Sequence, residues 1–389
     1  MQKPKRKVCF PILSRIHYAR QKHLLALLQK SPNIDLQLVV GGSAVLEKYG
    51  ERFLPAIQKG GFTIHETLFN VIDGGNHLAM AKTAGLTALE FSNTLFKLDP
   101  DIVLIRGDRF EQLAAAMVAA YLNKTIVHIE GGDVTGTIDE SIRHAITKLS
   151  HVHLVTNDAS QKRVIQMGED PDAVFDVGSL DVEFAARVKK KLVSHFANTL
   201  GVGGDIDLSK PFLMVIQHPV TTEKDNRRNI EMTLEVVDEL RVPAVWFWPN
   251  SDAGTNEMAK AIRVFREEEK TKNNQIRFIT DVLPEDFMTL LKNTACLVGN
   301  SSSGIKEASY FGTPVVNIGT RQQGRLRSEN VWDVGYDKKE IKKRILGQLT
   351  HGCYRSSKLY WKPDTSKKIV RIIQNTPLYK QKKFFEAPV

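Results

Sequence analysis

The feature that most constrains the fold is a series of short apolar runs, each followed by glycine or polar residues and then by a longer amphipathic segment. Continuously apolar runs of this kind are typical of parallel strands buried on both faces of a sheet. Strands that alternate with helices favour a doubly wound α/β architecture. The predicted strands are 7–13, 35–42, 101–108, 125–132, 151–157 and 174–179 in the first half, and 212–219, 244–250, 276–280, 296–302 and 314–319 in the second.

The chain has 389 residues, more than one hydrophobic core ordinarily supports. The segment from about 185 to 211 holds a lysine run, the sequence GVGGD and Pro211, and no clear strand, so it is the natural boundary. We therefore predict two Rossmann-like α/β domains, 1–190 and 205–389, facing one another across a cleft. Whether the C-terminal helix packs back on the N-terminal domain is left open.

The composition indicates a globular protein, with 42% apolar and 25% charged residues. No apolar run reaches the ~18 residues that a membrane-spanning helix needs. The basic start is followed by a short apolar segment broken by Pro11, which we interpret as a strand rather than a signal peptide. Three widely spaced cysteines form no CxxC pair or metal-ligand cluster, which fits a reducing cytosol. We expect a cytoplasmic protein without a membrane segment, disulfide or metal.

The net charge of +10, from 54 basic and 44 acidic residues, favours anionic ligands. The excess is spread over the chain, and its clusters are not interleaved with aromatic residues that could stack on bases. Solvated surface and a phosphate-bearing small molecule are therefore better explanations than nucleic acid. Binding of nucleic acid would rest on net charge alone.

Polar motifs follow the predicted strands at their carboxyl ends, where ligands bind in open α/β sheets. These motifs are RGDRF, HIEGGD, QHPVTT, WPNSDAG and GNSSSG. No strand is followed by a Walker A loop or a GxGxxG fingerprint, which disfavours ATP and NAD bound in the usual ways. The pattern predicts a ligand site built from both domains.

The stretch HIEGGDVTGTIDESIRHAITK, from 128 to 148, combines acids, bases and glycines. Thr137 and Glu140 match a capping box, so a helix is expected to begin at about Ile138. Its predicted buried face is Ile138, Ile142, Ala145 and Leu149. Capping explains the helix start, but it does not explain Glu130 at the strand end, and a buried carboxylate needs a partner or a task.

Other motifs leave two interpretations open. Asp108 and Arg109 are either a surface pair or an acid and an anion binder facing the crevice. GNSSSGIKEA, 299–308, is either a serine-capped helix start or a phosphate site with Glu307 accepting from ribose hydroxyls. For His218 a structural role is the commoner explanation, although its place at a strand end favours the cleft, and for Arg321 solvated loop charge is the default, with an anion clamp as the alternative.

Taken together, RGDRFE, HIEGGDVTGTIDESIRHAITKLSH, QHPVTT, PNSDAG, GNSSSGIKEA and GTPVVNIGTRQQGR resemble the hydrolysing UDP-N-acetylglucosamine 2-epimerases of the sialic-acid and legionaminic-acid pathways. The resemblance extends from about residue 7 to 373 with the motifs in order. It implies a GT-B-like fold, a UDP-sugar substrate, and a homodimer or homotetramer. It also implies that a UDP-2-acetamido sugar and water become UDP and the C2-inverted free sugar, by anti elimination and hydration of a glycal, without metal or cofactor.

By the same resemblance, Asp108, Glu130, Asp139 and His218 match the catalytic positions of the family. The positions that match its UDP-sugar contacts are Arg15, Arg109, His218, Asn250, Ser301, Ser302, Glu307 and Arg321. Crowded carboxylates suit removal and return of a weakly acidic C2 proton, and Asp139 is favoured as the base or an electrostatic partner, since a first helical turn stabilises an anion.

The first loop departs from the family. It reads RIHYAR here, with His17, Ala19 and Arg20 where an acid, a serine and a lysine are usual. These positions bear on the choice between N-acetylglucosamine and a 2,4-diacetamido-2,4,6-trideoxy sugar. Two other functions share the architecture: a GT-B glycosyltransferase, which does not require the acidic cluster, and a nucleotide-sugar sensor, which would keep the UDP site while losing the carboxylates.

Overall fold

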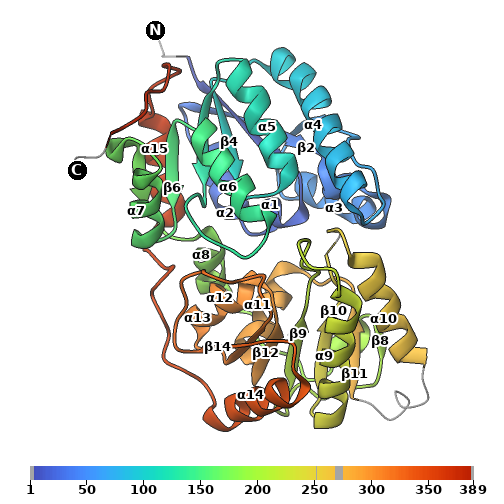
Figure 1. Cartoon of the computed structure of the whole chain (residues 1–389). Helices are drawn as coiled ribbons and strands as arrows, with labels where there is room; N and C mark the ends of the chain where they lie inside the picture. Colours follow the sequence, from blue (N-terminus) through green and yellow to red (C-terminus); the bar gives the residue numbers. More distant parts are fainter. Residues whose placement is uncertain (1–3, 251, 268–274, 387–389) are drawn as a thin grey trace. The chain divides into compact units, whose positions relative to one another are not determined.

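The computed structural model describes residues 4–250, 252–267 and 275–386, and leaves out the side chains of residues 15, 16 and 47–52. The chain divides into two compact units (Figure 1). Unit 1 comprises residues 1–133, 138–184 and 361–389, and unit 2 comprises 134–137 and 185–360. The C-terminal segment thus lies in unit 1.

Unit 1 is built on a parallel sheet in the order β3-β2-β1-β4-β5-β6-β7, with the strand order reversing between β1 and β4. The strands are β1 Arg6–Ile12, β2 Ile34–Val40, β3 Ile64–Thr67, β4 Ile102–Arg106, β5 Thr125–Ile129, β6 Val152–Val155 and β7 Val174–Asp176. The helices are α1 Arg15–Ala19, α2 Lys22–Lys30, α3 Glu47–Lys59, α4 His77–Leu98, α5 Phe110–Tyr121, α6 Ile138–Leu149, α7 Asp158–Gln166, α8 Leu180–Arg187 and α15 Thr365–Asn375.

Unit 2 has the sheet order β14-β13-β12-β9-β10-β11-β8, with the reversal between β9 and β12. Its six parallel strands repeat the order of the first six strands of unit 1, and β8 is added antiparallel at the edge. The strands are β8 Val202–Gly203, β9 Leu213–Ile216, β10 Ala244–Phe247, β11 Ile276–Ile279, β12 Cys296–Gly299, β13 Val315–Ile318 and β14 Val331–Val334. The helices are α9 Asn226–Leu240, α10 Thr255–Glu267, α11 Pro284–Asn293, α12 Ser302–Ile305, α13 Glu307–Phe311 and α14 Lys338–His351. The predicted class, two Rossmann-like α/β units, is confirmed.

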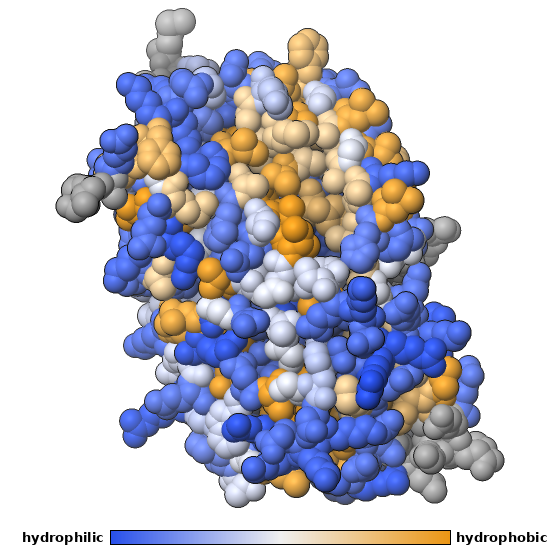
Figure 2. Space-filling model, in the orientation of Figure 1, coloured by the Kyte–Doolittle hydropathy of each residue, from blue (hydrophilic) through white to orange (hydrophobic). Residues whose placement is uncertain are grey.

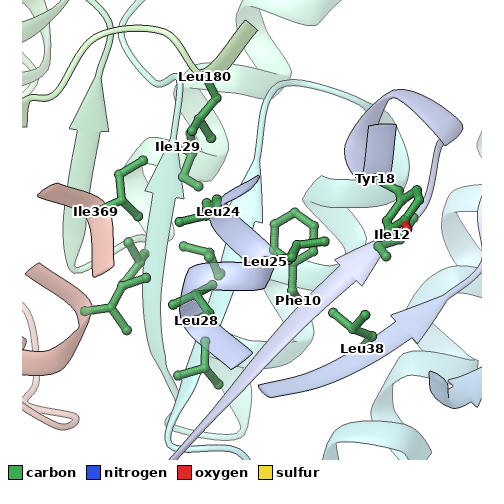
Figure 3. Packing of buried hydrophobic residues seen from close by; sticks show 14 of the residues in the cluster. Phe10, Ile12, Tyr18, Leu24, Leu25, Leu28, Leu38, Ile129, Leu180 and Ile369 are labelled. Carbon is green, nitrogen blue, oxygen red and sulfur yellow. The ribbon is translucent and has the colours of Figure 1, made fainter. Parts of the chain in front are cut away.

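The unit 1 sheet is buried on both faces because successive residues of its strands point to opposite sides. Phe10 and Ile12 of β1 pack on one side with Leu24 and Leu28 of α2 and with Ile369 of α15 (Figure 3). The core on the other side includes Cys9, Val103 and Ile105 of the sheet, with Phe91 and Leu95 of α4 and Ala115 of α5. The outer surface over α4 and α5 shows many apolar atoms (Figure 2).

All predicted strands are present, but three observed strands were not predicted. The expectation of no strand between 185 and 211 is wrong, since β8 pairs antiparallel with β11. β8 has two exposed residues, one of them glycine, and so carries no apolar signal. β3 and β14 are short outer strands without a continuous buried run. Edge strands bury little surface, and their sequences need no apolar periodicity.

Candidate active site

Two of the predicted acids leave adjacent strands of unit 1 at the carboxyl edge of the sheet. Asp108 follows β4, and Glu130 follows β5 directly. Arg106 is in register with Ile129, and the backbone N–H of Gly107 donates to the carbonyl of Ile129 at 2.9 Å. β4 is also the strand at which the order reverses, so both acids stand beside the position where open α/β sheets bind ligands.

Asp108 is held by Arg143, a residue of α6. The Arg143 side chain is 1% exposed, pairs with the Asp108 carboxylate, and donates to the carbonyl of Asp133 at 2.8 Å. Burial acts to lower the pKa of Arg143, but Asp108 and Asp133 raise it above its ordinary value, and Asp139 adds to the effect. The Arg143 cation therefore interacts electrostatically with three acids, Asp108, Asp133 and Asp139.

The helix containing Asp139 begins at Ile138 as predicted, and its predicted buried face is correct only in part: Ile142 and Leu149 pack against the core, but Ile138 does not. Ile138 is 45% exposed, whereas Arg143, Ile146 and Thr147 are buried. Arg143 lies on the buried side of the helix because its guanidinium donates there to the Asp108 carboxylate and the Asp133 carbonyl. An apolar template cannot anticipate a cation on the buried face.

Glu130 belongs to a second charged cluster, which is buried in the same unit. Arg106 pairs with Glu130 at 3.3 Å and with Asp181 at 2.6 Å. Arg20 approaches Asp181 at 3.4 Å, and the Ser179 hydroxyl donates to Glu130 at 3.4 Å. The two carboxylates raise the pKa of Arg106 despite its burial, so this arginine stays a cation beside Glu130.

The backbone of Glu130 is strained. Its φ of +70° lies in the left-handed region, which costs a residue with a side chain roughly 1–2 kcal/mol. Such conformations concentrate at functional sites, where the surrounding structure enforces them. Here the Glu130 N–H donates to the carbonyl of Leu154 at 2.9 Å while the side chain reaches Arg106. The strain aims the carboxylate into the charged cluster.

Two buried histidines of unit 1 are neutral parts of the scaffold. His128 bridges the Gly107 carbonyl, at 2.9 Å from Nε2, and the Thr147 hydroxyl, at 3.1 Å from Nδ1. Since a carbonyl only accepts, Nε2 carries the proton and Nδ1 accepts from Thr147. His17 Nδ1 lies 3.1 Å from the amide nitrogen of Gln112. Burial, foremost, lowers the pKa of each histidine to about 3.

Of the predicted UDP-sugar contacts in unit 1, Arg109 makes a bidentate pair with buried Glu111, at 3.0 and 3.1 Å. Arg15 opens α1, but its side chain lies outside the described part of the chain. In the loop that departs from the family, Arg20 faces Asp181 and His17 feels the charges of Arg106 and Asp108. Two of the residues that differ from the family, His17 and Arg20, therefore interact with carboxylates of unit 1.

Unit 2 brings His218 to the point where its own strand order reverses. The His218 N–H donates to the side chain of Asn300 at 2.7 Å, and the Asn300 amide donates back to the His218 carbonyl at 2.8 Å. The Asn250 N–H donates to His218 Nδ1 at 3.1 Å. Burial, followed by the positive charge of Arg321, lowers the pKa of His218 to about 3. With Nδ1 accepting, Nε2 carries the proton of this neutral ring.

Further predicted residues cluster around Asn300. Arg321 donates to the Asn300 carbonyl at 3.1 Å. Ser301 caps α12, Ser302 is its first residue, and both serines are partly exposed. The single helix expected after GNSSSG is instead two short helices, because α12 ends before Lys306 and Glu307 starts α13. Glu307 is buried beneath them and accepts from Ser303 at 3.3 Å.

The sequence interpretation missed Arg106 and Asp181, and it missed the role of Arg143. A signal existed for Arg106: an arginine that closes the apolar run IVLIR must find an acid inside the protein. Asp181 is far along the chain, and no spacing rule connects it to Arg106.

Among the described residues, no group of three or more His, Cys, Asp or Glu side chains could hold a metal ion. In the same part of the chain, every helix is too short or too polar to cross a membrane.

Comparison with known proteins places the chain in a family. Residues 26–374 match the family described as UDP-N-acetylglucosamine 2-epimerase. The UDP-N,N'-diacetylbacillosamine 2-epimerase (hydrolyzing) of Legionella pneumophila is 32% identical over 377 residues, covering 97% of each chain. The UDP-N-acetylglucosamine 2-epimerase of Neisseria meningitidis is 30% identical over 381 residues, covering 96% of this chain and 97% of that one.

The solved structure of the Methanocaldococcus jannaschii UDP-GlcNAc 2-epimerase, in complex with UDP-GlcNAc and UDP, has the same fold. It aligns with a TM-score of 0.76 at 19% identity, over 94% of this chain and 99% of that one. The chain belongs to the UDP-N-acetylglucosamine 2-epimerase family, as its motifs indicated, and is a UDP-sugar 2-epimerase.

Proposed function

We propose that this epimerase is of the hydrolysing kind and converts a UDP-2-acetamido sugar and water to UDP and the free sugar inverted at C2. In the first step, a base takes the C2 proton, the C1–O bond breaks, and UDP leaves with the bonding electron pair. A 2-acetamidoglucal with a C1–C2 double bond remains. In the second step, water adds its hydroxyl to C1, and a proton returns to C2 from the opposite face.

The observation that carries this proposal is the pair of arginine-held carboxylates at adjacent strand ends. Asp108 is held by Arg143, and Glu130 by Arg106. Elimination and hydration need one group to take a proton and another to give one, and positioned carboxylates beside fixed cations supply both. Asp139, in the first turn of α6, joins them through its interaction with Arg143. We propose Asp108, Glu130 and Asp139 as the catalytic acids.

We assign UDP to unit 2. His218, Asn250, Ser301, Ser302 and Arg321 gather around Asn300 at the reversal point of the sheet, with Glu307 beneath them, as the contacts described above support. Arg321 supplies positive charge and His218 a neutral N–H donor, which suits a diphosphate that gains charge as it departs. From unit 1 we add Arg109, which would exchange part of its pairing with Glu111 for phosphate, and Arg15.

The names of the Legionella and Neisseria relatives give two sugars as candidate substrates. We propose UDP-N-acetylglucosamine or its 2,4-diacetamido-2,4,6-trideoxy analogue, with a free C2-inverted sugar that supplies nonulosonic acid synthesis. The three cysteines are free thiols, which is consistent with a cytoplasmic reaction.

The test is incubation of the enzyme with each UDP-sugar in deuterated water, without an acceptor. We expect release of UDP in step with a free C2-inverted sugar that carries deuterium at C2, identified by NMR. A UDP-linked epimer as the accumulating product would instead indicate a non-hydrolysing epimerase. Release of UDP only after addition of an acceptor sugar would indicate a glycosyltransferase, and binding without turnover would indicate a sensor.

A further inference from the structure

The segment 376–386, which follows α15, contains no helix or strand and belongs to unit 1. We call it the C-terminal tail, and Figure 1 shows it on the side of unit 1 where α7 lies. Its first part is held at two points. The Arg6 guanidinium donates to the carbonyl of Thr376, and the Tyr379 ring packs edge-on against His151, with ring centroids 5.3 Å apart. The tail is therefore attached to unit 1 from its beginning.

The far end of the tail is fitted to the turn after α7. The Phe385 N–H donates to the Gly168 carbonyl at 3.0 Å. A Cβ at Gly168, whose φ is +81°, would stand 2.3 Å from the Phe384 ring, so the ring occupies space that only glycine leaves open. The Lys148 ammonium of α6 lies 5.1 Å from the centre of the same ring, which suits a cation–π contact. Phe384 thus contacts both α6 and the turn after α7.

Between these two ends, Lys382 reaches the C-terminal end of α6. Its ammonium donates to the carbonyls of Lys148 at 2.7 Å, Ser150 at 2.8 Å and Thr147 at 3.4 Å. The last carbonyls of a helix lack partners within the helix, and they carry the negative end of its dipole. Lys382 therefore supplies both the donors and the positive charge that stabilise this helix end.

A buried carboxylate keeps the Lys382 ammonium at this place. Glu169 is 2% exposed, and its oxygens lie 2.6 Å from the ammonium groups of Lys382 and Lys148 and 2.9 Å from Nε2 of His153. Burial acts to raise the pKa of Glu169, but these three neighbours hold it below its ordinary value. The carboxylate thus stays charged, and an ion pair drawn out of water in this way resists separation.

The helix that the tail caps is also the helix that holds Asp108. Arg143, on its buried side, pairs with the Asp108 carboxylate. One turn later, the Thr147 hydroxyl donates to His128, and His128 donates to the carbonyl of Gly107. Gly107 is the residue directly before Asp108. A shift of α6 along its axis would move both attachments together, so the position of the helix end bears on the position of the carboxylate.

We propose that the C-terminal tail positions the Asp108 carboxylate for reaction, with Lys382 as the positioning residue. Lys382 fixes the end of α6, and α6 fixes the Arg143 guanidinium against Asp108. This role rests on the proposed function, in which Asp108 is one of the catalytic acids. A displacement of about 1 Å at a catalytic group reduces a rate by as much as about 100-fold. A contact remote from the chemistry is therefore sufficient to affect turnover.

Lys382→Met tests the tether in the full-length enzyme, with Lys383→Met as the matched control. Methionine keeps the apolar part of the side chain and removes the ammonium, while Lys383 is exposed. Without its cap the end of α6 should fray. Hydrogen–deuterium exchange should therefore be faster at the C-terminal amides of α6 in Lys382→Met and unchanged in Lys383→Met. Wild-type exchange across α6 in Lys382→Met would overturn the proposal.

The kinetics of UDP release show whether the helix end affects the reaction. At a temperature where Lys382→Met is fully folded, we expect its kcat to fall by about 10-fold and its KM to change by less than about 2-fold. Lys382→Arg, which keeps the charge and the donors, should recover most of the lost kcat. A purely structural role would lower the unfolding temperature and leave kcat at the wild-type value, and that result would overturn the proposal.

A double-mutant cycle with Arg143→Met tests the route through α6. If Lys382 acts through Arg143, the kcat loss from Lys382→Met should nearly vanish in the Arg143→Met background. Full additivity of the two losses would overturn the proposal. A wild-type enzyme that releases no UDP would count against the proposed function instead, and exchange at α6 would still decide whether the tail holds the helix.

Discussion

Arg143 donates a hydrogen bond from Nη2 to Oδ2 of Asp108, and the two side chains differ sharply in exposure: 1% for Arg143 and 31% for Asp108. The cation is sealed in unit 1 while the anion remains open to a ligand on one side. A buried guanidinium that orients a partly open carboxylate is a means of positioning a catalytic acid before substrate arrives.

Replacement of Arg143 should therefore affect stability and catalysis together. We expect Arg143→Met to lower the unfolding free energy by about 2–3 kcal/mol, since the Asp108 carboxylate and the Asp133 carbonyl lose their donor. The kcat should fall by about 100-fold or more, with a smaller change in KM. Arg143→Lys, which keeps the charge without the planar fork, should be intermediate. Urea unfolding and steady-state kinetics measure both, and a wild-type kcat in Arg143→Met would contradict the role.

The left-handed backbone of Glu130 predicts an unusual order of variant stabilities. A protein with glycine in a strand or at its end is ordinarily less stable than one with alanine there. At a φ of +70°, however, glycine avoids the steric cost that a Cβ brings. We expect Glu130→Gly to be more stable than Glu130→Ala by up to about 1 kcal/mol. Both should lose about 1,000-fold in kcat because the carboxylate is gone. The stability order is read from urea midpoints, and the reverse order would show that the strain is absent.

Gly299 should be intolerant of even a methyl group. Its φ is +128°, and a Cβ there would stand 2.0 Å from the carbonyl oxygen of Ile216, where β12 meets β9. Gly299→Ala should cost about 3 kcal/mol or more and weaken UDP binding, because Asn300 and Ser301 would be displaced. Gly335→Ala is the matched control in unit 2, since a Cβ there meets no described atom within 4 Å. Gly335→Ala should change the free energy of unfolding by at most about 0.5 kcal/mol. Equal stabilities of Gly299→Ala and Gly335→Ala in calorimetry would refute the expectation.

Buried histidines predict a loss of stability in acid. The pKa values of His17, His128 and His218 are lowered to about 3 in the folded protein, against about 6.5 when unfolded. The unfolded chain therefore binds more protons between these values. The stabilising contribution is complete above about pH 6.5 and is lost as the pH falls toward 3. Each ring adds a slope of up to about 1.4 kcal/mol per pH unit.

Unfolding in urea at several pH values measures this slope. His128→Gln keeps one donor and one acceptor for Gly107 and Thr147 but cannot titrate. Below about pH 5.5, this variant should take up about one proton fewer on unfolding. The slope of unfolding free energy against pH should then be smaller by about 1.4 kcal/mol per pH unit. An unchanged slope would mean that His128 is not buried as a neutral ring.

Much of this protein was predictable from local patterns. Apolar runs located the parallel strands, and the polar residues after them, such as Asp108 and Glu130, were correctly placed at strand ends. The start of α6 at Ile138 was also predicted, by its capping residues. These features depend on neighbours within a few positions, so the sequence displays them directly.

Only the tertiary structure decided which charges meet. Arg106 and Asp181 are 75 positions apart, and Asp108 and Arg143 are 35 apart, so no periodicity relates them. The burial of Arg143 is decided by the free energy of pairing buried charges rather than by an apolar pattern. The chain's sequence thus determined its α/β architecture and its family. The packing of strands from distant segments determined which arginine holds Asp108 and which holds Glu130.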